Sequence, residues 1–211
     1  MTKRVFITAT NTDIGKTYTT LKLLEELTAQ GYKVGVIKPI ETGVTSTPLD
    51  GSLLYDTVCQ LNPLMKNLTI NDIVPIQFKL PAAPYIANHA KKIDLTPIDN
   101  AIKKIELYRD ILLIEGAGGA LVPIDKETMI IDLIVRYEAK ALLVSHGDLG
   151  CINDTLQNIN TLKQYNIDFE WVLNCRDYES FSAISKPFFD DTYTSYYLLQ
   201  NNITELAKKL L

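Results

Sequence analysis

Short, mainly apolar runs alternate along the chain with longer stretches in which apolar residues recur every three or four positions. The short runs are residues 5–7, 34–37, 110–114, 141–144 and 171–173. Because their apolar residues are consecutive rather than alternating, each run is typical of a strand that is buried on both faces of a sheet. The stretches between them, at 17–29, 52–61, 97–107, 130–137 and 153–165, predict helices; Leu21, Leu24 and Leu27 form the apolar face of the first.

Strands that alternate with helices predict an α/β fold with a doubly wound, mostly parallel sheet. No repeat, low-complexity tract or linker interrupts the 211 residues, so we expect a single domain over residues 1–211. In such a fold, ligands bind beyond the carboxyl ends of the strands. The residues that directly follow each predicted strand are therefore the candidates for function.

Composition narrows the class of partner. The chain is 46% hydrophobic and 22% charged, with a formal net charge of -4, so neither nucleic acid nor an anionic membrane is indicated. No apolar run approaches the length of a membrane span. The cysteines Cys59, Cys151 and Cys175 are far apart and none forms a C-x-x-C pair, so we expect reduced thiols, no zinc site and a cytoplasmic location.

The first predicted strand is followed by the sequence TNTDIGKT, residues 10–17. A strand, a polar loop, Gly-Lys-Thr and a helix stand in the order of a phosphate-binding P-loop. Backbone N–H groups at the start of the helix can hold phosphate oxygens, Lys16 can add a positive charge, and the Thr17 hydroxyl can ligate Mg²⁺. The alternative is an ordinary turn with a chance Gly-Lys-Thr. We therefore predict a P-loop NTPase-like domain.

Charged residues end the second and third predicted strands. Lys38 follows the second, where it either faces the phosphate loop or is a surface lysine. Glu115 ends the third and precedes Gly116, Ala117, Gly118 and Gly119. A carboxylate at this place is where P-loop proteins hold a metal ion, although it could also cap a tight turn. The glycines would let the backbone approach a ligand closely.

The ends of the fourth and fifth strands carry weaker signals. The fourth leads into SHGDLGCIN, residues 145–153, which opens a helix whose N-terminus can bind an anion. Asn174 ends the fifth strand, and its amide could read a nucleobase edge. His89 and His146 are isolated, with no nucleophile motif beside them, so we expect structural roles for both.

Five motifs in this order resemble the dethiobiotin synthetase family. The family loop G-T-D-T-x-x-G-K-T corresponds to ATNTDIGKT at residues 9–17, and K-P-x-x-[ST]-G corresponds to KPIETG at 38–43. The sequence EGAGG at 115–119 is unchanged, L-G-[CT]-[IL]-N matches LGCIN at 149–153, and W-V-x-N matches WVLN at 171–174. The family acid on the helix after a variable loop looks like Asp56. The resemblance extends from about Lys3 to about Cys175.

The resemblance implies a cyclo-ligase that uses ATP, Mg²⁺ and CO2 to carboxylate 7,8-diaminopelargonic acid (7,8-diaminononanoate) and close its cyclic urea in biotin biosynthesis. A carbamate would attack the γ-phosphate, and the second amine would then displace phosphate. A homodimer is implied, with the substrate site at the subunit interface. It further implies Lys16 and Lys38 as catalytic residues and Thr17, Asp56 and Glu115 as metal ligands.

The remaining residues implied by the resemblance fall into two sets. The nucleotide-binding set comprises Asp13, Ile14, Gly15, Lys16, Thr17, Tyr18, Asp56, Glu115, Gly116, Ala117, Gly118, Asn174 and Cys175. The substrate-binding set comprises Thr12, Lys38, Thr42, Gly150, Cys151, Ile152 and Asn153, with the substrate carboxylate at the helix N-terminus that the last four residues form.

The sequence departs from the family in three respects. Ala9 replaces the first glycine of the loop, and Asn11 and residues 146–148 stand where the family commonly has acidic or basic residues. The G-x-[IL]-P segment that completes the nucleobase pocket is absent after Asn174, which predicts weaker discrimination of adenine than is usual in the family.

Three other interpretations stay open. Amidating cobyrinate and cobyric acid synthases share this fold but need a glutaminase domain, for which 211 residues leave no room. A MinD/ParA-like switch ATPase would have a signature lysine where this chain has Asn11. An inactive P-loop protein is the third.

Overall fold

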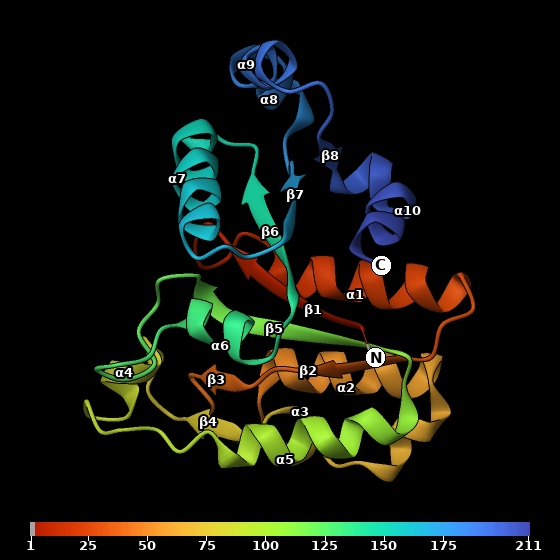
Figure 1. The fold of residues 1–211 in the computed structure, drawn as a ribbon, viewed down its shortest axis with the longest axis vertical. Coiled ribbons are helices and arrows are strands. Elements are labelled where there is room, and N and C mark those ends of the chain that lie inside the picture. The colour runs from red at the N-terminus through yellow and green to blue at the C-terminus, as the bar shows by residue number, and fades with distance from the viewer. Residues whose placement is uncertain (1–2) are drawn as a thin grey trace.

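The computed structural model describes residues 3–211 (Figure 1). In that part of the chain, a main sheet has six parallel strands in the order β2-β5-β1-β6-β7-β8, and a small second sheet pairs β3 with β4 in parallel. The strands are β1 Lys3–Ala9, β2 Val34–Ile37, β3 Ile40–Thr42, β4 Ile76–Phe78, β5 Ile111–Gly119, β6 Lys140–His146, β7 Phe169–Asn174 and β8 Tyr197–Leu198. The predicted α/β fold with a mostly parallel sheet is confirmed.

Helices connect most of the strands. The α-helices are α1 Lys16–Ala29, α2 Leu49–Leu61, α3 Ile70–Ile73, α4 Pro84–Ala87, α5 Thr96–Ile105, α6 Ile130–Arg136, α7 Cys151–Gln164, α8 Tyr178–Ile184, α9 Lys186–Thr192 and α10 Leu199–Leu210. The 3₁₀ turns are η1 Pro63–Asn67 and η2 Glu106–Tyr108. None of the helices described between residues 3 and 211 has the length and apolar character needed to cross a membrane.

The direction of the chain along the sheet explains the double winding. From β1 the chain moves through α1 to β2 at one edge, whereas α6 and α7 carry it from β5 to β6 and on to β7 in the opposite direction. Since crossovers between parallel strands are right-handed, opposite directions place α1 on the face opposite α6 and α7. Figure 1 shows α7 and α10 on opposite sides of β6 and β7, and α10 packs with α1.

The core lies where the central strands meet α1. Val5, Phe6 and Ile7 of β1 are fully buried, as are Leu24 and Leu27 of α1. Each such side chain contributes about 1.5–3 kcal/mol by leaving water. The continuous apolar runs therefore have the physical origin that the sequence indicated, namely burial on both faces of the sheet.

Strand β5 is longer than predicted. It continues through Gly119, so residues 115–119 belong to a strand that pairs with β1, and the alternative of a tight turn at Glu115 is not what the structure shows. Gly119 lies opposite Ala9, and a Cβ at Gly119 would stand 3.1 Å from the Ala9 carbonyl oxygen. The glycine thus lets the end of β5 run close beside the start of the phosphate loop.

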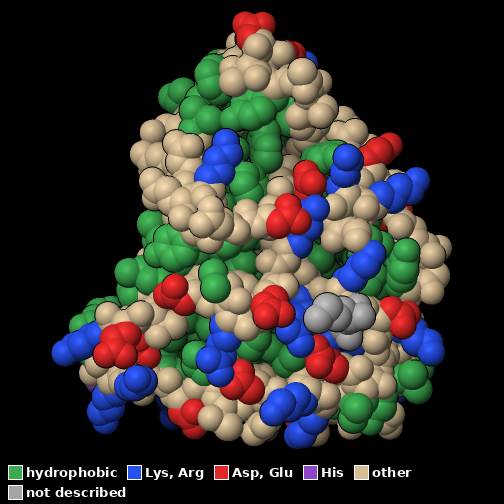
Figure 2. All heavy atoms as spheres, in the orientation of Figure 1, with side chains coloured by type: hydrophobic (Ala, Val, Ile, Leu, Met, Phe, Trp, Pro, Cys, Tyr) green, Lys and Arg blue, Asp and Glu red, His purple; other side chains and the backbone are tan. Residues whose placement is uncertain are grey.

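The C-terminal part contains elements that the sequence did not predict. Helices α8 and α9 form a small aromatic cluster with β7, in which the Trp171 and Tyr196 rings stack with centroids 5.9 Å apart. The chain then adds β8 to the sheet beside β7. Figure 2 shows charged side chains of both signs interspersed over the lower part of the visible face, so no single-sign field dominates there.

Candidate functional site

The loop between β1 and α1 has the backbone that an anion site requires. Gly15, directly before α1, adopts a left-handed conformation with φ 101°, and Asp13 does so with φ 59°. A Cβ at Gly15 would also stand 2.2 Å from the Asn174 side-chain nitrogen. Glycine is therefore required at this position for conformation and for space. Ala9, by contrast, lies inside β1, where a Cβ is tolerated, so the missing first glycine does not disturb the loop.

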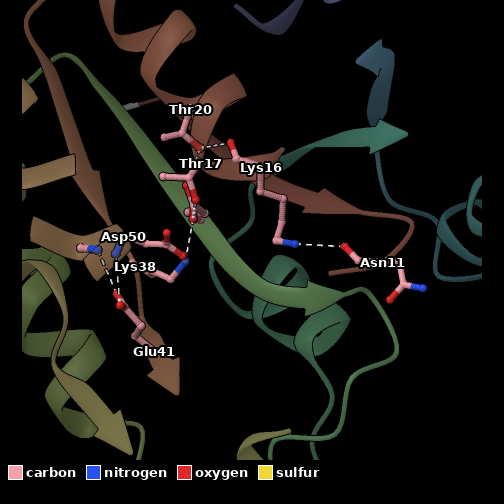
Figure 3. A network of polar contacts seen from close by, with 9 residues as sticks. Asn11, Lys16, Thr17, Thr20, Lys38, Glu41 and Asp50 are labelled. Atoms are coloured by element: carbon pink, nitrogen blue, oxygen red, sulfur yellow. Dashed lines mark hydrogen bonds and ion pairs between the residues drawn. The ribbon is translucent and has the colours of Figure 1, made fainter. Parts of the chain in front are cut away.

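Glu115 links Thr17, Thr20 and Lys38, which are labelled in the polar network of Figure 3. Its side chain is completely buried and accepts three hydrogen bonds: from the Thr17 hydroxyl at 2.9 Å, from the Thr20 hydroxyl at 2.7 Å and from the Lys38 ammonium at 2.7 Å. Buried carboxylates need such partners because desolvation of an unpaired charge is costly. Strand β5 thereby fixes a carboxylate beneath the first turn of α1.

Lys38 bridges two carboxylates. Its ammonium lies 2.7 Å from Glu115 Oε1 and 2.7 Å from Asp50 Oδ2, and its side chain is only 5% exposed. Burial opposes the charged form, but the two carboxylates outweigh burial, so the pKa of Lys38 is raised above its usual value. Lys38 is therefore a permanently charged residue of the site rather than a surface lysine.

Lys16 has the opposite electrostatic environment. Its ammonium donates to the Asn11 carbonyl oxygen at 3.1 Å, and Figure 3 shows the side chain extended toward that residue. Burial, followed by the nearby charge of Lys38, lowers the pKa of Lys16 to about 8. The charged form of Lys16 thus lacks a carboxylate partner of its own, which leaves it available to an anion.

Glu41 fixes the start of α2. Its carboxylate accepts hydrogen bonds from the backbone N–H groups of Asp50 at 3.2 Å and Gly51 at 2.9 Å. Burial raises the pKa of Glu41 despite these bonds. Since a carboxylate near a helix N-terminus is stabilised there, Glu41 holds Asp50 in place next to Lys38.

A cleft of about 850 Å³ opens above this network. Predicted site residues on its wall are Thr12, Asp13, Gly15, Lys16, Thr17, Lys38, Thr42, Ala117 and Gly118. The wall is completed by residues that the sequence did not indicate as functional: Ile40, Glu41, Asp50, Pro81, Ala82, Ala83, Pro84, Val122 and Arg176. The size fits a ligand pocket, which typically measures about 300–1,000 Å³.

The structure places Asp56, the metal ligand that the resemblance implies, away from the cleft wall. Asp56 is exposed on α2 and is absent from the cleft wall, whereas Asp50, in the first turn of the same helix, reaches Lys38 and the cleft. Six residues correspond to about 9 Å along a helix. Asp50 could have been found from its place two residues after Pro48, because proline with an acidic residue in the first turn is a signal of a helix start.

Several predicted residues lie away from the cleft wall. Ile14, Tyr18, Glu115, Gly116, Asn174 and Cys175 border the loop or lie below it, and Gly150, Cys151, Ile152 and Asn153 form the start of α7. Gly150 precedes that helix with φ 99°.

His146 lies 3.1 Å from Asp154 on α7, an interaction in keeping with the structural role that we expect for it. All the cysteines described between residues 3 and 211 are buried and unpaired.

Oxygen atoms near Lys38 are of the kind that suits a magnesium ion. The Lys38 ammonium contacts the Asp50 and Glu115 carboxylates, and the Thr17 hydroxyl donates to Glu115. A hydroxyl and two carboxylates therefore lie close together, and oxygen ligands of this kind suit Mg²⁺. Within residues 3–211, no three His, Cys, Asp or Glu side chains are grouped to hold a metal by themselves. Ligand oxygens and water would therefore have to complete the coordination of the ion.

Comparisons with known proteins agree with this geometry. A family model described as an AAA domain matches residues 3–195. The ATP-dependent dethiobiotin synthetase BioD of Sulfurovum sp. is 42% identical over 98% of this chain and 99% of its own length. The enzyme of the same name from Wolinella succinogenes is 39% identical over 99% of this chain and 98% of its own length. That from Helicobacter pylori is 34% identical over 88% of each chain.

Solved structures with a similar fold include a plasmid partition protein from Borrelia burgdorferi, with a TM-score of 0.59, 13% identity and coverage of 100% of this chain and 99% of that one. The MinD cell division protein of Aquifex aeolicus has a TM-score of 0.54 and 16% identity, and the match covers 98% of this chain and 86% of that one. At such low identity, these similarities indicate the fold alone. The relatives with higher identity carry the name of a synthetase, which favours an enzyme over a switch ATPase.

Proposed function

This chain belongs to the ATP-dependent dethiobiotin synthetase family, and on that premise we propose that it joins CO2 to 7,8-diaminopelargonic acid and closes the cyclic urea at the expense of ATP. The observation that carries the proposal is the convergence of Lys16, Lys38 and Asp50 on one cleft beside the phosphate loop, with Glu115 paired to Lys38 beneath it. A reaction that combines a triphosphate with a carbamate needs such a set of charges, because both reactants are anions.

The nucleotide part of the proposal rests on the loop. Backbone N–H groups from Asp13 to Tyr18 would cradle the triphosphate at the start of α1, and the Lys16 ammonium would approach the β- and γ-phosphates. Thr17, Asp50 and Glu115 would hold Mg²⁺, with Asp50 in place of the predicted Asp56. Mg²⁺ would supply neutralisation of the phosphate charge.

Lys38 would act on the carbamate. One amine of the substrate adds to CO2 and loses a proton to give a carbamate, whose oxygen attacks the γ-phosphate and releases ADP. The second amine then attacks the carbonyl carbon, expels phosphate and closes the ring. A lysine that keeps its charge can hold the carbamate and the transferring phosphoryl oxygens throughout, and positioning of this kind supplies catalysis without a general-base histidine.

Thr12 and Thr42 lie on the same cleft wall and would bind the diamine and carbamate end of the substrate. Gly150, Cys151, Ile152 and Asn153 begin a 14-residue helix away from this wall. We place them at the substrate carboxylate of the partner subunit's cleft in a homodimer, where the helix N-terminus would favour an anion. A cytoplasmic location is part of the proposal and rests on the unpaired cysteines.

The test is phosphate release from MgATP by the purified protein, with and without 7,8-diaminopelargonate and bicarbonate, together with detection of dethiobiotin. We expect release that requires both added substrates. Release that does not depend on the diamine, or that rises with membrane or DNA, would contradict the proposal and favour the switch ATPase class. Absence of release with ATP, GTP and CTP would indicate an inactive P-loop protein.

A further inference from the structure

Side chains from the end of β7 hold the phosphate loop by its carbonyl groups. The Asn174 side-chain nitrogen donates to the Ile14 carbonyl oxygen at 2.9 Å, and the Arg176 guanidinium donates to the Asp13 carbonyl oxygen. Both acceptors belong to the loop that carries the left-handed residues Asp13 and Gly15. A non-glycine residue in that conformation costs about 1–2 kcal/mol, so the loop needs external contacts to keep it there.

These contacts also set the direction of the loop's donors. In a planar trans peptide, the C=O of one residue and the N–H of the next point in opposite directions, and none of the peptide bonds described between residues 3 and 211 is cis. Carbonyls of Asp13 and Ile14 that face the β7 side therefore turn the N–H groups of Ile14 and Gly15 away from β7. Gly15, which carries one of these N–H groups, lines the cleft together with Asp13.

Gln200 holds Asn174 in turn. Its side-chain nitrogen donates to Asn174 Oδ1 at 3.2 Å and to the Cys175 carbonyl oxygen at 2.8 Å. The amide of Asn174 is thus engaged at its oxygen by Gln200 and at its nitrogen by Ile14, and Asn174 is only 6% exposed. One N–H and one oxygen lone pair of the amide are used in these bonds, which fix its orientation between Gln200 and the loop.

The strand register explains why Gln200 reaches this point. Leu198 of β8 lies opposite Leu173 of β7 in a parallel pair, so Gln200, two residues further on, arrives beside Cys175. The Leu198 N–H donates to Asn202 Oδ1 at 3.0 Å, which fixes the junction between β8 and α10. Helix α10 also packs on α1, the helix that follows the phosphate loop. The tail is therefore anchored on both sides of the loop.

We propose that Arg176, which contacts the loop directly, and Gln200, which acts through Asn174, are positioning residues that hold the phosphate-binding loop in its anion-binding conformation. Affinity for a nucleoside triphosphate depends on them, and the identity of the base does not. This inference rests on the proposed use of a nucleoside triphosphate. It assigns a role to the C-terminal segment that stands where the family's nucleobase motif is missing.

Gln200→Glu gives the sharpest test, because it keeps the shape of the side chain but replaces both donated hydrogen bonds with a carboxylate facing two oxygen atoms. The matched control is Asn201→Asp, which adds the same charge at the next, exposed position of α10. Calorimetric titration with MgATP, MgGTP and MgCTP should show affinity about fivefold weaker for all three nucleotides in Gln200→Glu. Asn201→Asp should match the wild type.

A second pair tests the other contact. Arg176→Met removes the donor to Asp13 and should also weaken the affinity for all three nucleotides several-fold. Arg176→Lys, which keeps a donor, should recover part of the lost affinity. The rate at saturating nucleotide should change less than twofold in each variant, whereas the KM for nucleotide should rise. A loss confined to one base would overturn the proposal, because these residues would then be base readers. Unchanged affinity in both Gln200→Glu and Arg176→Met would also overturn it.

Nucleotide titration requires no diamine, which separates this inference from the proposed function. A wild-type protein that binds nucleotides but forms no dethiobiotin would refute the proposed function and leave the loop test intact. A wild-type protein that forms dethiobiotin, with variants of unchanged nucleotide affinity, would refute only the positioning role. A fall in melting temperature without a change in affinity would show a purely structural contact and would count against the proposal.

Discussion

Replacement of Lys38 by methionine separates the structural role of this lysine from its catalytic role. Met has nearly the same length but no charge, so Lys38→Met leaves the fully buried Glu115 without its cation. Removal of one partner of a buried ion pair costs about 3–5 kcal/mol. Glu115 keeps its hydrogen bonds from Thr17 and Thr20, which favours the lower end of that range. We therefore expect a loss of about 3 kcal/mol in the free energy of unfolding.

For a chain of this length, the expected loss lowers the melting temperature by about 6–12 °C. Urea titration followed by circular dichroism would measure the free energy of unfolding, and dethiobiotin formation would be assayed on the same preparations. The double variant Lys38→Met with Glu115→Gln removes both charges, so it should recover most of the lost stability. It should remain inactive, because neither the lysine charge nor the carboxylate is restored.

Asp50→Asn is the matched control. The Asp50 side chain is 48% exposed, so its pair with Lys38 is screened by solvent and contributes at most about 1 kcal/mol. Glu115 still neutralises Lys38 in this variant. A Lys38→Met protein that loses less than about 1 kcal/mol, or a double variant as unstable as the single one, would refute the assignment of Glu115 and Lys38 as a coupled buried pair.

Three further predictions concern the cleft. Asp50→Asn should raise the Mg²⁺ concentration needed for half-maximal turnover at least tenfold, whereas Asp56→Asn should leave it unchanged; a magnesium titration of both variants decides between the two acids. Because burial lowers the pKa of Lys16 to about 8 and a bound phosphate favours the charged form, nucleotide binding at pH 8 should take up about 0.5 proton, and affinity should fall as pH rises from 7 to 9. Calorimetry in two buffers of different ionisation enthalpy measures the uptake, which should vanish in Lys16→Arg. Gly15→Ala should abolish detectable MgATP binding, since its Cβ meets Asn174 and its φ of 101° is strained; near-normal binding would contradict the loop geometry.

The sequence was sufficient to predict the central sheet and the position of most charged residues. Consecutive apolar residues from 111 to 114 imply burial on both faces, and a charged residue that ends such a strand must face the edge where ligands bind. Lys38 and Glu115 were located in this way, and both lie in the network of the site. Their mutual contact was not foreseen, because strand order does not follow from the order of strands along the chain.

The resemblance points to Asp56, whereas the geometry of the cleft points to Asp50. Position on a helix matters to within one residue, since each residue rotates the side chain by about 100° and advances it by about 1.5 Å. The sequence predicts a helix from residue 52, whereas α2 begins at Leu49, so Asp50 lies in the first turn of the helix. An error of three residues at a helix start is unimportant for the fold but affects which acid is expected at the cleft.

The contacts of the C-terminal segment could not have been predicted from local patterns. Strand β8 has only two residues, too few for a periodic signal, and it exists because β7 offers an unpaired edge. The bonds from Gln200 depend on that register. Absence of the family's nucleobase motif therefore marked the right segment, but the replacement was visible only once the strands were paired.

The two lysines of the cleft show how one site gives the same residue type two roles. Lys38 lies between two carboxylates, which raise its pKa, so it stays charged whether or not an anion is present. Lys16 is buried near that charge, which lowers its pKa to about 8, so its charge is favoured once a phosphate arrives. When environments push the pKa values of neighbouring groups apart, the groups take different functions. Lys38 therefore suits the part of the reaction that needs a constant positive charge, and Lys16 suits the part in which charge must follow the nucleotide.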